Sequence, residues 1–197
     1  MQDYDEEWLL AESCRIDRSA RTAFAAACAE LLWPVVERYA AAVSLPAERL
    51  EVLRGSLDAV WDALDGVDAD VAAARATAES MVPFDGDEDW VMEAGYAQSA
   101  IAAVVYAARS WLTDDPQEAV WAARQVYEAA DYAAQHADGR AVMVYSADVE
   151  DELRTATVVR AATRAVAEWL DQAATHSPST VRRSVRAESR AFAGLFA

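Results

Sequence analysis

Apolar residues recur along most of the chain at the three- and four-residue spacing of amphipathic helices. The clearest stripe falls within residues 46–64 and consists of Leu50, Leu53, Leu57, Val60, Trp61 and Leu64. Similar spacing predicts further helices over residues 5–13, 19–43, 69–81, 116–135 and 148–174, with a last one starting near residue 177. Residues 90–112 are apolar around most of the helical circumference, which is typical of a helix surrounded by others.

The residues that break helices support the same division of the chain. Pro46 and Pro116 stand at first-turn positions, and Gly66 follows the 46–64 stripe where a helix would end. Pro34 lies inside the 19–43 helix and predicts a kink there. With 6 Gly and 5 Pro in 197 residues, all-β and α/β folds are disfavoured. We therefore expect an all-α fold, a single bundle of seven or eight helices with residues 90–112 near its centre.

A chain of 197 residues has the size of one domain. We assign residues 1–177 to the helical bundle and residues 178–197 to an Arg-rich C-terminal helix, either docked on the bundle or extended. If this helix docks, it should bury Phe192, Leu195 and Phe196. The apolar run at residues 142–145 is expected to be a loop packed on the core.

The net charge of the chain favours some classes of binding partner over others. Asp and Glu number 34 against 17 basic residues, all of them Arg, so the net charge is −17. Nucleic acid and anionic membrane surfaces are disfavoured as partners, because binding them depends on neutralising phosphates. A basic protein is the electrostatically favoured partner. The alternative interpretation is that the acidic surface serves solubility alone.

Several features indicate a cytoplasmic protein. The two cysteines, Cys14 and Cys28, form no disulfide framework and are expected to be reduced thiols. The first residues are acidic, whereas a signal peptide begins with basic residues. The longest uncharged stretch, residues 94–108, is too short to span a bilayer.

No catalytic grouping is visible in the sequence. The two histidines, His136 and His176, have no Cys, His or Glu at metal-ligand spacing. Phosphate-binding glycine loops and a nucleophile elbow are also missing. We therefore assign no catalytic, cofactor-binding or metal-binding residue, and we expect Cys28, which lies in an apolar helical row, to be an inert core thiol.

The acidic loop at residues 85–89 resembles the start of a calcium-binding loop. However, Trp90 stands where that loop needs glycine, and Tyr96 stands where it needs glutamate. The simpler interpretation is a solvated loop whose carboxylates complement the dipole of the following helix. The rival interpretation is a docking surface for the Arg or Lys residues of a partner.

Three groups of residues carry a family resemblance. The first consists of Phe24, Glu30, Pro34 and Tyr39. The second is Leu-Asp-Ala-Val-Trp-Asp-Ala-Leu at residues 57–64, and the third is Pro83, the acidic loop and Tyr-Ala-Gln at residues 96–98. Over residues 19–170 the chain resembles the bacterial domain of unknown function 416 family, the YjaG-like proteins. It departs from the family pattern at Leu31, where Arg is common, and at Ser99, where Asp is common.

The resemblance implies an all-α bundle without an established activity. Our leading hypothesis is a non-enzymatic protein-binding domain that offers an acidic face to a basic partner, as an immunity protein does to a toxin. The expected contact residues are those of the acidic loop and of a second acidic ridge: Asp85, Asp87, Glu88, Asp89 and Trp90, with Asp62, Asp65 and Asp68.

Two alternatives belong to other functional classes. One is a small-ligand-binding or enzymatic bundle in which Asp58, Asp62 and Gln98 converge on an internal carboxylate pocket. The other is a homo-oligomeric structural protein, for example a homodimer, in which the Arg-rich helix 178–197 pairs with the acidic body of a neighbouring copy.

Overall fold

The computed structural model describes residues 4–84, 91–137 and 152–196, and every regular element in these ranges is helical. The elements are α1 (Glu6–Ser13), α2 (Arg18–Ala42), α3 (Ala47–Leu64), α4 (Val71–Glu79), α5 (Met92–Thr113), α6 (Pro116–Gln135), α8 (Thr157–Thr175), α9 (Pro178–Ala193) and the 3₁₀ helix η2 (Gly194–Phe196). The predicted all-α bundle is confirmed.

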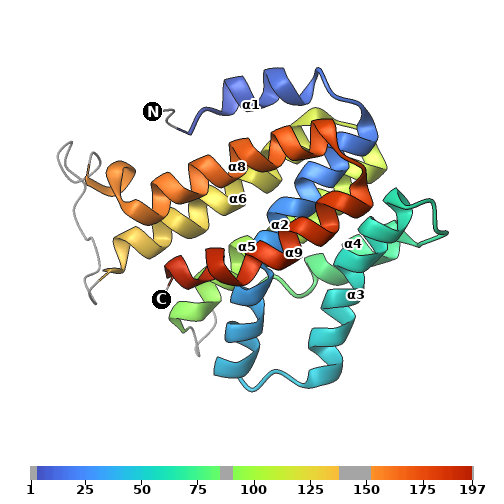
Figure 1. The fold of residues 1–197 in the computed structure, drawn as a ribbon. Coiled ribbons are helices and arrows are strands. Elements are labelled where there is room, and N and C mark those ends of the chain that lie inside the picture. The colour runs from blue at the N-terminus through green and yellow to red at the C-terminus, as the bar shows by residue number, and fades with distance from the viewer. Residues whose placement is uncertain (1–3, 85–90, 138–151, 197) are drawn as a thin grey trace.

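Helices α2 and α5 share the centre of the bundle. Helix α2 packs against α3, α5, α6, α8 and α9, and α5 packs against α2, α3, α4 and α6 (Figure 1). Residues 22–33 of α2 are all buried, and many of them are alanines, which allow neighbouring helices to approach closely. The helix predicted at the centre of the bundle, residues 90–112, corresponds to α5. Helix α2 is also central, since it packs against five other helices.

Acidic residues begin four of the helices. The side chains of the N-cap residues accept hydrogen bonds from the backbone amides of Trp8, Ala20, Ala73 and Gln117, and the caps are Asp5, Asp17, Asp70 and Asp115. Each cap satisfies an amide that the helix leaves unpaired and places negative charge at the positive end of the helix dipole. Part of the acidic composition therefore serves local structure.

Two helix-breaking residues act as the sequence predicts. Pro34 lies inside α2, and Figure 1 shows α2 bending partway along its length. Gly66 follows α3 with φ +79°, a left-handed conformation that glycine adopts without steric cost.

The helix predicted at residues 148–174 is interrupted at Ala156. Residues 152–155 are helical, and α8 begins at Thr157, because Ala156 is extended with φ −55° and ψ 142°. The hydroxyl of Thr155 donates to the carbonyl of Glu152 at 3.1 Å, a local bond that competes with a continuous helix. Residues 148–151 and the predicted loop at 142–145 lie outside the described residues.

The C-terminal helix docks on the bundle. Helix α9 packs against α2, α3 and α8, and it buries Phe192, while η2 buries Phe196. The expectation for Leu195 is wrong, since this side chain remains 41% exposed. None of the helices in the described ranges combines the length and the apolar character that a membrane span requires.

The packing of α5 on α6 predicts the effect of one substitution. A Cβ atom added to Gly95 would lie 2.5 Å from Cζ of Tyr132. We expect Gly95→Ala to lower the free energy of unfolding by about 1–3 kcal/mol in urea denaturation, because the tyrosine ring must move. Gly55→Ala is the matched control: its Cβ would meet no atom within 4 Å, so it should raise stability by about 0.5–1 kcal/mol. Equal effects would contradict this account.

Candidate functional site

The buried carboxylate of Glu30, which is 3% exposed, accepts four hydrogen bonds from side chains of α3 and α9. Arg54 donates to both of its oxygens, from Nη1 to Oε1 and from Nη2 to Oε2, each at 2.8 Å. Trp61 Nε1 adds a bond to Oε2 at 3.2 Å, and Arg186 Nε adds one to Oε1 at 3.0 Å. Each oxygen therefore has two donors, and Glu30 is saturated as an acceptor.

Asp58 continues this arrangement on the next turn of α3. It accepts hydrogen bonds from Arg54 at 3.0 Å, from Arg182 at 2.8 Å and from Arg186 at 2.5 Å. Arg182 also reaches Asp62 at 3.1 Å and comes within 3.8 Å of Asp65. We call the group formed by these side chains the Glu30 cluster: Glu30, Arg54, Asp58, Trp61, Asp62, Asp65, Arg182 and Arg186.

The cluster favours the charged forms of Asp58 and Arg54. Burial by itself would raise the pKa of Asp58, but the hydrogen bonds and charges of Arg54, Arg182 and Arg186 outweigh burial and lower it. Burial would likewise lower the pKa of Arg54, and its bonds to Glu30 and Asp58 raise it instead. Four carboxylates face three guanidinium groups, so the cluster is nearly neutral. Its carboxylates are engaged with arginines and are poorly suited to act as a general base.

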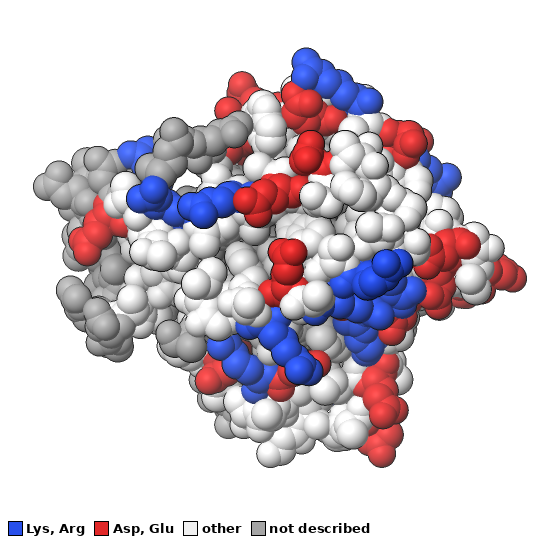
Figure 2. Space-filling view, viewed as in Figure 1, with Lys and Arg blue, Asp and Glu red and all other residues white. Residues whose placement is uncertain are grey.

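Helix α9 supplies four of the nine hydrogen bonds between members of the cluster. Arg182 and Arg186 are one helical turn apart, as are Asp58 and Asp62 on α3, so the two helices present opposite charges at matching spacing. Figure 2 shows the arginines gathered over α9 beside acidic side chains over α3 and α4. The Arg-rich C-terminal segment is thus bound to the acidic surface of its own chain.

Of the two predicted groups of contact residues, the structure describes only the second acidic ridge. The acidic loop at residues 85–90, with Asp85, Asp87, Glu88, Asp89 and Trp90, lies outside the described residues. In the second ridge, Asp62 and Asp65 face Arg182, whereas Asp68 is exposed in the turn between α3 and α4. The structure therefore divides the ridge into a part covered by α9 and a part open to solvent.

The residues proposed for an internal carboxylate pocket do not come together. Asp58 and Asp62 converge on Arg182. Gln98 lies elsewhere, lining a cavity between α5 and α6 and donating to the carbonyl of Pro83 at 3.2 Å. No group of three or more His, Cys, Asp and Glu side chains within the described ranges could hold a metal ion.

The arginine partners of the cluster were not predicted from the sequence. Arg54 and Asp58 are four residues apart on one helix, a spacing that favours an ion pair. The same spacing separates Arg182 from Arg186, which could have indicated a helix face with two adjacent cations. Which acids these cations meet was not readable, because Arg186 and Glu30 are 156 positions apart.

A second buried ion pair joins α5 to α6. Arg109 donates to Glu118 Oε1 through Nε at 2.9 Å and through Nη2 at 2.6 Å. The other oxygen, Oε2, is buried without a hydrogen-bond partner in the described part of the chain. Burial therefore outweighs the attraction of Arg109 and raises the pKa of Glu118, the opposite of the shift at Asp58.

Comparison with known proteins bears on the fold. No family model matches the chain. No curated protein sequence matches it either. Among solved structures, a DUF416 family protein from Shewanella baltica superposes with a TM-score of 0.75 at 12% identity, over 92% of this chain and 93% of that one. The chain has the fold of this DUF416 protein. The superposition supports the resemblance indicated by the sequence, and it assigns no activity, because DUF416 denotes a domain of unknown function.

The residues that carry the DUF416 resemblance have clear packing roles. Glu30 and Trp61 come from separate motifs and are hydrogen-bonded to each other in the cluster. Phe24 and Leu57 are fully buried and belong to the same hydrophobic core as Trp61. At one departure from the family pattern, Leu31 is an apolar core residue with 2% exposure. In the described residues, the first two motifs therefore mark the seam between α2 and α3.

The saturated carboxylate predicts a large loss of stability on substitution. Glu30→Gln would leave Arg54 and Arg186 without their shared anion, so the free energy of unfolding should fall by about 3 kcal/mol in urea denaturation. The matched control is Glu51→Gln, an exposed position on α3, which should change stability by less than about 0.5 kcal/mol. A loss at Glu30 no larger than at Glu51 would contradict a structural role for the cluster.

The two pKa shifts predict opposite pH dependences. Because folding lowers the pKa of Asp58, its carboxylate stabilises the protein above its unfolded pKa, about 3.9, and this contribution is lost as the pH falls through the lower folded value. The stability advantage of wild type over Asp58→Asn should therefore shrink below about pH 4.

For Glu118 the sign reverses, because its folded pKa is raised. The native state binds the proton more readily, so wild type should gain stability relative to Glu118→Gln as the pH falls through the folded pKa. Urea denaturation of both pairs between pH 3 and pH 7 measures the two trends. Parallel trends would contradict the assigned environments.

Proposed function

We propose that this protein is a non-enzymatic protein-binding domain that receives a basic segment of a partner on the acidic surface of α3, α4 and the turn between them. The observation that carries the proposal is the docking of α9. Its arginines show, within the chain, which chemistry the α3 surface accepts: guanidinium groups spaced one helical turn apart against carboxylates at the same spacing.

The acidic surface continues beyond the part that α9 covers. We define the open ridge as the exposed acidic residues Glu48, Glu51, Asp68, Asp70 and Glu79. Two exposed apolar side chains, Val52 at 53% and Val67 at 57%, lie on α3 and in the following turn. Apolar residues within a charged rim are typical of protein interfaces, whereas acids that serve solubility alone do not require them.

The overall charge favours the same class of partner. A chain with a net charge of −17 attracts a basic protein at long range and accelerates the encounter. An immunity protein that neutralises a basic toxin is the most concrete form of this proposal. The homo-oligomeric alternative receives less support, because Arg182 and Arg186 are engaged with the acids of their own chain.

Co-purification from the native host tests the proposal. The tagged wild type should recover a basic protein in stoichiometric amount, identified by mass spectrometry and confirmed with the isolated partner. The variant Glu51→Lys/Asp68→Lys should lose this partner, because it reverses the charge at two positions of the open ridge. Both side chains are exposed, so their replacement should cost little stability.

A charge-matched variant serves as the control. Glu168 and Asp171 are exposed on α8, away from α3, and Glu168→Lys/Asp171→Lys makes the same change in net charge. This variant should keep the partner. Recovery of no stoichiometric basic protein, or equal loss of the partner from both variants, would overturn the proposal.

A further inference from the structure

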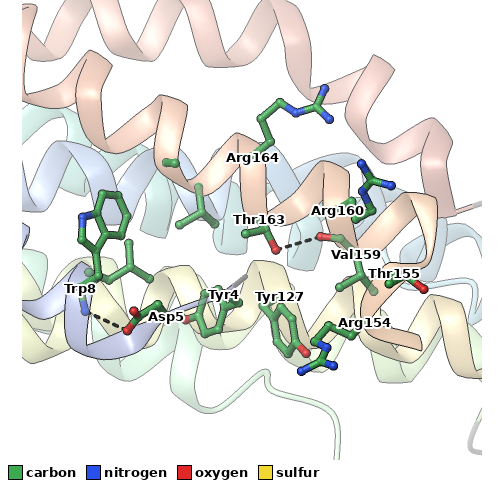
Figure 3. A pocket seen from close by; sticks show the side chains of 13 residues that line it. Tyr4, Asp5, Trp8, Tyr127, Arg154, Thr155, Val159, Arg160, Thr163 and Arg164 are labelled. Atoms are coloured by element: carbon green, nitrogen blue, oxygen red, sulfur yellow. Dashed lines mark hydrogen bonds between the residues drawn. The ribbon is translucent and has the colours of Figure 1, made fainter. Parts of the chain in front are cut away.

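A cavity lies between α1, α6 and α8, and none of the open-ridge residues lines it. Its volume is about 380 Å³, which falls within the range of small-molecule sites. Figure 3 shows α1 at one end of the cavity, with Tyr127 of α6 and Thr163 of α8 on facing sides. The cavity is thus formed where the N-terminal helix crosses two long helices.

The walls of the cavity are mainly aromatic and aliphatic. The rings of Tyr4 and Tyr127 stack with their centroids 4.5 Å apart and their planes 18° apart. Trp8, Leu9 and Val159 extend this apolar surface. Flat aromatic walls favour a flat apolar group in the ligand, because stacked rings add attraction beyond the area that they bury.

The rim of the cavity is basic, although the chain as a whole is acidic. Arg154, Arg160 and Arg164 are among the lining residues, and Figure 3 shows Arg160 and Arg164 projecting from neighbouring turns of α8. Among the described lining residues the single acidic one is Asp5, which is engaged as the N-cap of α1, where it accepts from the Trp8 amide at 3.0 Å. A local excess of positive charge therefore surrounds the opening.

Two of these arginines have no acidic partner among the residues that the structure describes. Arg160 and Arg164 are exposed, and they are one helical turn apart on α8, so both can reach the same anion. Most other arginines of the described chain are paired with carboxylates or stacked on aromatic rings. In a chain with twice as many acids as bases, two adjacent unpaired cations at a cavity are unexpected.

We propose that this cavity binds a small aromatic carboxylate, with its ring against Tyr4, Trp8 and Tyr127 and its carboxylate at Arg160 and Arg164. The planar guanidinium group binds a carboxylate through two parallel hydrogen bonds, and a pair of arginines places charge on both of its oxygens. The net negative charge of the protein does not prevent this, since salt screens distant charges beyond about 8–10 Å.

Isothermal titration calorimetry with naphthalene-2-carboxylate tests the proposal on the full chain. We expect saturable binding of one molecule per chain that weakens as salt increases. Naphthalene-2-carboxamide, which has the same ring and no charge, should bind at least tenfold more weakly. Inorganic phosphate, which is charged and has no ring, should also bind at least tenfold more weakly.

Substitutions locate the site. Arg160→Gln/Arg164→Gln should weaken the binding of naphthalene-2-carboxylate at least tenfold. Arg183→Gln/Arg190→Gln makes the same change in net charge at two exposed positions of α9 and should leave the affinity unchanged. Thr163→Trp should block the cavity from the side of α8, and thermal unfolding would show that each variant is folded.

Several results would overturn the proposal. One is the absence of saturable binding by naphthalene-2-carboxylate up to millimolar concentration. Others are equal binding of the carboxamide or of phosphate, and equal loss of affinity in the α8 and α9 variants. Dimerisation that buries this face, detected by a doubled mass in solution that Thr163→Trp abolishes, would assign the cavity to a second copy of the chain instead. All of these results are independent of whether the open ridge binds a basic protein.

Discussion

The arrangement of α2, α3 and α9 depends on the buried carboxylate of Glu30. A charge removed from water is destabilising by several kcal/mol unless it is paired and fully hydrogen-bonded. Arg54 and Trp61 from α3 and Arg186 from α9 supply four donors, so all three helices must meet in one register for the charge to be satisfied. The cluster therefore selects one packing of these helices, whereas the alanine-rich core around it would tolerate several.

The ion pairs between α9 and α3 also determine which acidic side chains remain available to a partner protein. Arg182 of α9 forms ion pairs with Asp58 and Asp62. The open ridge consists of exposed acidic residues that form no ion pair with α9. On another side of the bundle, Arg160 and Arg164 rim an aromatic cavity. The surface thus carries two areas of opposite charge, which can act separately because screening limits their mutual influence.

Capping and helix-breaking residues in the sequence were sufficient to predict the approximate ends of most helices. The caps Asp5 and Asp115 and the terminator Gly66 are close to the predicted ends of their helices. The helix and burial predictions were wrong at two places, one because of a local hydrogen bond and the other because of tertiary packing. Thr155 and Ala156 interrupt the helix predicted at 148–174, and Leu195 points to solvent although Phe192 and Phe196 are buried.

The sequence by itself determined the all-α class, the approximate helix boundaries and the acidic character, because each depends on residues within one or two helical turns. Only the tertiary structure decided that Arg186 meets Glu30, that Asp62 pairs with Arg182 of α9, and that Tyr4 and Tyr127 wall one cavity with arginines at its rim. These outcomes depend on which helix faces pack together. Periodicity shows that a face exists, but the choice of its partner depends on the fit of the whole core.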